Sequence, residues 1–191
     1  MSKSNIIFTI IFSFILTACD SNNQKIKETL ERFQSTPIDI PYDKFSCWTS
    51  DSIRKISPWK HATLKLVHYV DSSQCTSCYL SKMMVIGDFL NLEKESNEKF
   101  YNIFIVDPGV KKMNRLILKK EYDNKEIPTT LFIDTMQIFI KKNPAIPKEI
   151  AYHTFLVDEK NNVIFVGSPY INDVVREKTI NIIKEKLKKI K

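Results

Sequence analysis

Glycine is scarce in this sequence, with three residues among 191. Phosphate-binding loops of the types GxGxxG and GxxxxGK[ST] use several closely spaced glycines to bring the backbone near a phosphate group. No such loop can be assembled here, so nucleotide-binding folds that depend on one are excluded. The sequence also contains no internal repeat and no low-complexity tract.

Positive charge is in excess but is not concentrated. The chain carries 29 Lys and Arg against 22 Asp and Glu, a formal net charge of +7. The densest basic run, KEKLKKIK, closes the chain, where lysines complement the dipole of a helix end. No basic stripe is interleaved with aromatic residues, as on nucleic-acid-binding surfaces. We therefore expect no nucleic-acid partner.

Apolar residues are abundant enough to build a core. They make up 43% of the chain and include 12 Phe and 7 Tyr, while 27% of the residues are charged. Because domains usually contain roughly 100–200 residues, this length predicts one domain with short additions.

The longest apolar run lies at the N-terminus, between Ile6 and Leu16. It is shorter than the ~20 residues that span a bilayer, but it suits the apolar region of a signal peptide. Leu16-Thr17-Ala18-Cys19 resembles a bacterial lipobox. The resemblance implies that residues 1–18 are a signal peptide, that Cys19 carries lipid, and that the mature protein is extracytoplasmic and membrane-anchored. The alternatives are a plain signal peptide with an incidental cysteine, or an N-terminal anchor.

Three cysteines remain besides Cys19, in a compartment that permits disulfides. Cys47 has no partner nearby in the sequence. We predict either a buried thiol that acts as a small apolar residue, or a third thiol able to reach the other two. These two, Cys75 and Cys78, are separated by two residues.

Strand and helix patterns alternate along the rest of the chain. We expect strands at 62–71, 100–107 and 127–134, helices at 78–96 and 108–123, a short helix or extended edge at 135–143, a hairpin at 151–169 and a final helix at 171–191. A helix near 25–33 and an irregular edge segment at 38–50 precede them. Alternating strands and helices predict a parallel sheet with right-handed crossovers and helices on both faces, and the hairpin adds an antiparallel edge.

The pair in Cys75-Thr76-Ser77-Cys78 falls where a helix is expected to follow a strand. A thiol at a helix N-terminus is favoured as thiolate, because it lies near unsatisfied backbone N–H groups. In this position the first cysteine attacks a disulfide, and the second resolves the mixed disulfide. Two intervening residues let one helical turn close the disulfide. The pattern predicts a redox-active dithiol that needs no bound cofactor.

Residues from about 60 to 191 resemble the thioredoxin superfamily, and specifically its TlpA-like, extracytoplasmic thiol-disulfide oxidoreductases. The lipobox and VDSSQCTSCYLSKM together also resemble Bacteroidota lipoproteins with a CTSC pair. The resemblance implies an α/β, thioredoxin-like three-layer fold over 59–191: a central mixed sheet, helices on both faces and an inserted strand-helix segment. Residues 19–58 form a tether and N-terminal extension. Gln74 replaces the usual aromatic residue, and neither Pro nor His separates the cysteines.

The resemblance also implies a cis-proline that faces the disulfide from the loop before a late strand. IPTTLFID would supply Pro128. AYHTFLVDEKNNVIFVG matches the following hairpin better, which makes IPTTLFIDTMQIF the inserted segment and leaves Tyr152 or a neighbour such as His153 in the position. We prefer this second alignment, because the hairpin must lie next to the C-terminal helix. A cis bond without proline costs about 2.5–4 kcal/mol, so we expect a trans Tyr152–His153 peptide.

Other functions remain open from the sequence. A copper chaperone of the Sco type would use Cys75, Cys78 and His153, although that family spaces its cysteines CxxxC; otherwise no metal is expected. A peroxiredoxin would match Ser72-x-x-Cys75, but His68 stands where its proline should be, and we expect His68 to be a packing or surface residue. The third alternative is a non-catalytic envelope binding module. For the oxidoreductase, the expected partners are thiols or disulfides of envelope proteins and a membrane dithiol donor or acceptor; both directions of electron flow stay open.

Overall fold

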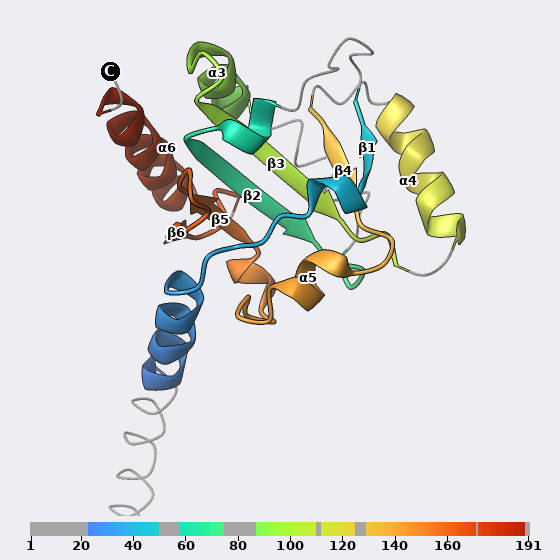
Figure 1. The fold of residues 1–191 in the computed structure, drawn as a ribbon, viewed down its shortest axis with the longest axis horizontal. Coiled ribbons are helices and arrows are strands. Elements are labelled where there is room, and N and C mark those ends of the chain that lie inside the picture. The colour runs from blue at the N-terminus through green and yellow to red at the C-terminus, as the bar shows by residue number, and fades with distance from the viewer. Residues whose placement is uncertain are drawn as a thin grey trace, which may run out of the picture.

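The computed structural model describes residues 23–49, 58–74, 87–109, 112–124, 129–170 and 172–189 (Figure 1). The predicted site residues Cys19, Cys75, Cys78 and Pro128 lie outside these ranges. Within them, the chain forms one mixed sheet with the strand order β1-β4-β3-β2-β5-β6.

Three parallel strands form the middle of the sheet: β2 (Leu64–Val70), β3 (Phe100–Val106) and β4 (Leu131–Ile133). Every residue of these strands is buried. Parallel strands are covered on both faces, which explains why their sequences are nearly continuous apolar runs. Antiparallel strands complete the sheet: β1 (Ser46–Trp48) beside β4, and the hairpin of β5 (Thr154–Val157) and β6 (Val163–Val166) beside β2.

One face of the sheet is covered by α3 (Gly87–Glu95), α4 (Lys112–Asn124) and α6 (Asp173–Lys188). The chain moves from β2 to β3 to β4 in a single direction across the sheet, so right-handed crossovers put α3 and α4 on the same side. Side chains from all three helices join one core cluster, among them Phe89, Leu118 and Ile183. Asn172 caps α6 by accepting a hydrogen bond from the backbone N–H of Val175.

The other face is covered by the last turn of an N-terminal helix at residues 23–34, the segment that follows it, and α5 (Ile138–Lys142). Phe33 is fully buried, and its ring meets that of Phe155 edge-on at 5.0 Å. Ile38 and Ile40 are buried in the same cluster. The N-terminal extension is therefore part of the domain core from Phe33 onward.

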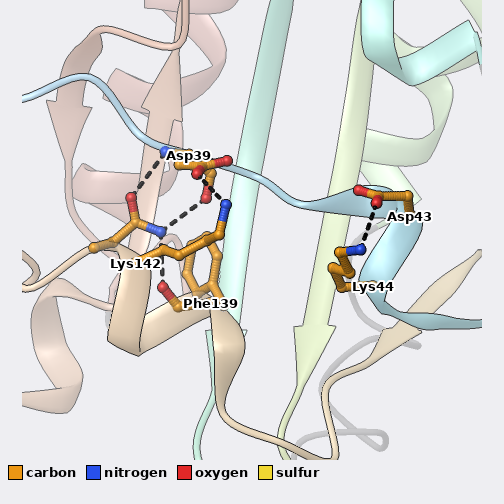
Figure 2. A network of polar contacts seen from close by, with 6 residues as sticks. Asp39, Asp43, Lys44, Phe139 and Lys142 are labelled. Atoms are coloured by element: carbon orange, nitrogen blue, oxygen red, sulfur yellow. Dashed lines mark hydrogen bonds and ion pairs between the residues drawn. The ribbon is translucent and has the colours of Figure 1, made fainter.

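A polar lock holds this extension against α5, as Figure 2 shows. The Asn143 side chain accepts a hydrogen bond from the Asp39 backbone N–H at 2.8 Å and donates to the carbonyl oxygens of Asp39 and Phe139, each at 2.8 Å. Lys142 Nζ lies 2.6 Å from Asp39 Oδ2. The polar atoms of the Asn143 side chain are satisfied, although the residue is 3% exposed.

The predicted fold class is confirmed. The sheet is mixed, helices cover both faces, and β4 with α5 supplies the inserted strand and helix of a thioredoxin-like fold. The segment expected at 38–50 provides the edge strand β1, and 135–143 contains a short helix. In the hairpin turn Asn161 has a positive φ of 62°, and Asp158 Oδ1 accepts from the N–H groups of Lys160 and Asn162. Among the described residues, no helix is both long and apolar enough to cross a membrane.

Candidate functional site

A tight turn follows β2 and leads directly to Cys75. Asp71 begins the turn, and its Oδ1 accepts a hydrogen bond from the Ser73 backbone N–H at 2.8 Å and another from the Ser73 hydroxyl. The Gln74 backbone N–H donates to the Asp71 carbonyl oxygen at 3.1 Å. An aspartate that binds the backbone two residues ahead stabilises such a turn. The turn is therefore fixed up to the residue before the first cysteine.

The start of β5 lies beside this turn. β5 pairs antiparallel with β2, with Thr154 opposite His68, and the Tyr69 N–H donates to the His153 carbonyl oxygen at 2.9 Å. His153 is thus the residue that enters β5 next to the end of β2. Tyr152 lies one residue earlier, in a short 3-10 turn (Ile150–Tyr152). All peptide bonds between described residues are trans, including Tyr152–His153.

The position of β4 in the sheet concerns the alternative alignment, in which Pro128 would occupy the cis-proline position. Pro128 precedes β4 in the sequence, and β4 is separated from β2 by β3. The strand that neighbours β2 on its antiparallel side is β5. Of the described candidates for the docking loop, Tyr152 and His153 therefore lead into the strand beside β2, with His153 the nearer of the two.

The imidazole of His153 is 4% exposed and lies between two oxygen acceptors. Nε2 is 3.0 Å from the carbonyl oxygen of Pro147, and Nδ1 is 3.4 Å from Asp71 Oδ2. A carbonyl oxygen only accepts hydrogen bonds, so Nε2 carries a proton. Nδ1 makes no hydrogen bond, and its contact with Asp71 is an ion pair only when the ring is charged. An imidazolium would satisfy both acceptors, whereas a neutral ring satisfies one.

Two more aspartates lie at the same end of the sheet, and both stabilise the local structure through hydrogen bonds. Asp107 accepts from the Gly109 N–H and the Gln137 side chain, while Asp134 accepts from the first N–H groups of α5. Burial, and after it the charges of Asp107, Asp71 and Asp134, raise the pKa of Tyr69. Within the described ranges, no group of three His, Cys, Asp or Glu residues is arranged to hold a metal ion.

His68 is a core residue, in agreement with the packing alternative. Its side chain is fully buried and stacks on Phe104 with ring centroids 4.3 Å apart. Burial lowers the pKa of His68 to about 3, against a smaller opposing effect of the Asn102 side chain. The ring is therefore neutral at physiological pH. It faces the cluster under α3, α4 and α6 rather than a site open to substrate.

Cys47 is exposed, so the prediction of a buried thiol is wrong. It lies on β1, the edge strand that pairs with β4. Partial burial nevertheless raises the pKa of its thiol. Since β1 and β2 are three strand spacings apart, Cys47 is roughly 14 Å across the sheet from β2.

Sequence reasoning did not identify Asp71 or Pro147 as partners of His153. Asp71 was visible as an aspartate at the end of an apolar run, but nothing in the sequence pairs it with a histidine far along the chain. The hydrogen bond from His153 to Pro147 uses a backbone carbonyl. Because every residue has such a carbonyl, the sequence does not reveal the acceptor.

Comparison with solved structures returns proteins of low sequence identity. One is a thioredoxin-like protein in its oxidised form (TM-score 0.48, 13% identity, 77% of this chain and 93% of that chain). Another is a putative thioredoxin from Neisseria meningitidis (TM-score 0.45, 13% identity, 74% of this chain and 90% of that chain). A third is StoA from Bacillus subtilis (TM-score 0.44, 14% identity, 64% of this chain and 88% of that chain). No protein-family model and no curated protein matches the sequence.

Proposed function

We propose that this protein is a thiol-disulfide oxidoreductase whose reacting groups are Cys75 and Cys78. One observation carries the proposal. The CxxC sequence begins immediately after a turn fixed by Asp71, at the carboxyl end of a buried strand that lies between parallel β3 and antiparallel β5. In open α/β sheets, reactive groups gather at the carboxyl ends of the strands.

The exchange needs two sulfur atoms and no cofactor. The Cys75 thiolate attacks one sulfur of a target disulfide, a Cys75–target disulfide forms, and one target thiolate leaves and takes up a proton. Cys78 then loses its proton and attacks the Cys75 sulfur, which releases the second target thiolate. The target gains two electrons, and a Cys75–Cys78 disulfide remains. A membrane dithiol donor would reduce it again; the reverse sequence would oxidise target thiols.

The proposal includes a location. Cys19 in the lipobox-like sequence would carry lipid, placing the domain at the extracytoplasmic side of a membrane, where its targets would be thiols or disulfides of envelope proteins. In the described part of the N-terminal helix, Phe33 is the buried residue, and most of the preceding residues are exposed. This helix would form the spacer between lipid and domain.

No observation favours the copper chaperone over the oxidoreductase. A copper ligand needs a free imidazole nitrogen. His153 Nε2 is hydrogen-bonded to the Pro147 carbonyl oxygen, so a metal could use only Nδ1, which lies 3.4 Å from Asp71 Oδ2.

Insulin reduction in the presence of dithiothreitol tests the proposal. The wild type should accelerate precipitation of the insulin B chain, Cys75→Ser should abolish the acceleration, and Cys78→Ser should accumulate mixed disulfides. Cys47→Ser is the matched control and should behave as the wild type, because Cys47 lies across the sheet from β2. Equal rates for wild type and Cys75→Ser would instead indicate a non-catalytic binding module.

A further inference from the structure

A pocket of about 360 Å³ opens beside the turn that precedes Cys75. Its volume is at the lower end of the range for ligand sites, roughly 300–1,000 Å³. Most of the lining is apolar or aromatic, and three polar side chains complete it. The lining residues are Tyr69, Ile140, Pro144, Ile146, Pro147, Asp71, Lys148 and His153.

The apolar wall of this pocket is held rigidly. It consists of α5 and the NPAIP segment that follows, in which two prolines restrict the backbone. Asn143 ties this segment to the N-terminal extension through two hydrogen bonds with the Asp39 backbone, and to α5 through a third with Phe139 (Figure 2). His153 ties its far end to β5 through Pro147. When the walls of a cavity are already fixed, binding does not have to order them, and that free-energy cost is avoided. Such a cavity favours a ligand of matching shape.

The few residues between Asp71 and Cys75 limit how far the proposed dithiol can lie from the pocket. Asp71 lines it, and Asp71 is four residues before Cys75. Four residues span at most about 14 Å when fully extended. A polypeptide bonded to Cys75 through its own cysteine could therefore reach the pocket with a side chain only a few residues away.

We propose that the pocket receives a large apolar side chain, such as leucine, that lies near the reacting cysteine of the partner polypeptide. The inference rests on the proposed function, because it requires a mixed disulfide at Cys75. The apolar wall selects for the size of the side chain. The polar residues at the pocket carry charges of both signs, Asp71 against Lys148, and so give no preference for an anion.

A competition between thiol peptides tests this selectivity. Full-length Cys78→Ser protein is equilibrated in a thiol-disulfide buffer with equal amounts of two cysteine peptides, identical except for leucine or alanine near the cysteine, on either side. Mixed disulfides are assigned by proteolysis and mass spectrometry. We expect leucine to exceed alanine by about tenfold at Cys75, since a few methylenes in an apolar pocket discriminate by at least this factor. Cys47, exposed and distant from β2, is the internal reference and should give a ratio near one.

Substitutions at two positions of one helix complete the design. Ile140 lines the pocket and Ile138 does not, while both are half-buried. Ile140→Lys should bring the leucine-to-alanine ratio at Cys75 toward one, and Ile140→Ala should lower it partly; Ile138→Lys should leave it unchanged. Adducts at Cys75 without a preference for leucine, or a preference that Ile140→Lys retains, would overturn the pocket assignment alone. Failure to form any adduct at Cys75 would overturn the proposed function and this inference together.

Discussion

His153 and Asp71 face each other where β5 begins and β2 ends, with Nδ1 of the histidine 3.4 Å from Oδ2 of the aspartate. The aspartate fixes the turn before Cys75, and the histidine fixes the loop that enters β5. This contact therefore couples two segments that are far apart in the sequence and adjacent at the proposed site.

The first prediction concerns that coupling. Asp71→Ala and His153→Ala should each destabilise the protein, because each removes a side chain that fixes one of the two segments, and the double variant should lose less than the sum of the two. For groups in direct contact, the interaction energy is typically about 0.5–3 kcal/mol. Urea unfolding of the four proteins measures it. Strictly additive losses would show that the two side chains do not interact.

A second prediction follows from the neutral state of buried His68. Its pKa is about 3 in the folded protein and about 6.5 when unfolded. The unfolded state thus binds the extra proton, and stability falls as the pH drops through 6.5 toward 3. The loss from this residue is ~2 kcal/mol at pH 5 relative to neutral pH.

His68→Phe should remove that part of the pH dependence, because phenylalanine can stack on Phe104 and does not titrate. Unfolding midpoints at pH 7 and pH 5 provide the comparison. His61, which is exposed, supplies the control: His61→Gln should keep the wild-type pH dependence. An unchanged pH dependence in His68→Phe would mean that other groups cause it.

The third prediction tests whether the N-terminal extension belongs to the fold. Phe33 is fully buried against Phe155, so Phe33→Ala should cost about 3–5 kcal/mol of unfolding free energy. Ile26, 37% exposed on the same helix, is the matched control, and Ile26→Ala should have little effect. Equal stability of both variants would mean that the extension does not contribute to the core.

A fourth prediction separates two adjacent residues of the polar lock. Asn143→Ala leaves the part-buried backbone N–H and carbonyl oxygen of Asp39 without their side-chain partner, at about 1–3 kcal/mol for each such group, while the Phe139 carbonyl keeps its bond from the Asn143 backbone N–H. Lys142→Ala breaks only an ion pair whose side chains are about half exposed, worth less than about 1 kcal/mol. Chemical denaturation of both variants should reproduce this order, and the reverse order would contradict it.

Much of the fold was predictable because it depends on local patterns. In some segments the residue types follow directly from burial or turn geometry. These segments are the apolar runs of β2 and β3, the hairpin turn with Asn161, and the apolar stripe of α6. The burial of Cys47 was predicted wrongly, since a three-residue edge strand has too few residues to show which side faces the core. The core contribution of Phe33 lay in a segment whose polar composition suggests a tether.

The sequence by itself determined the chemistry that this protein can offer: two cysteines two residues apart, a lipobox-like N-terminus, and alternating strands and helices. Tertiary structure decided which side chains accompany that chemistry. It brought His153 to Asp71, placed the NPAIP segment and Tyr69 around one pocket, and separated Cys47 from β2 by three strand spacings. The reason is physical: spacing along the chain specifies local geometry, whereas contacts between distant residues depend on strand order, which emerges only when the whole core packs together.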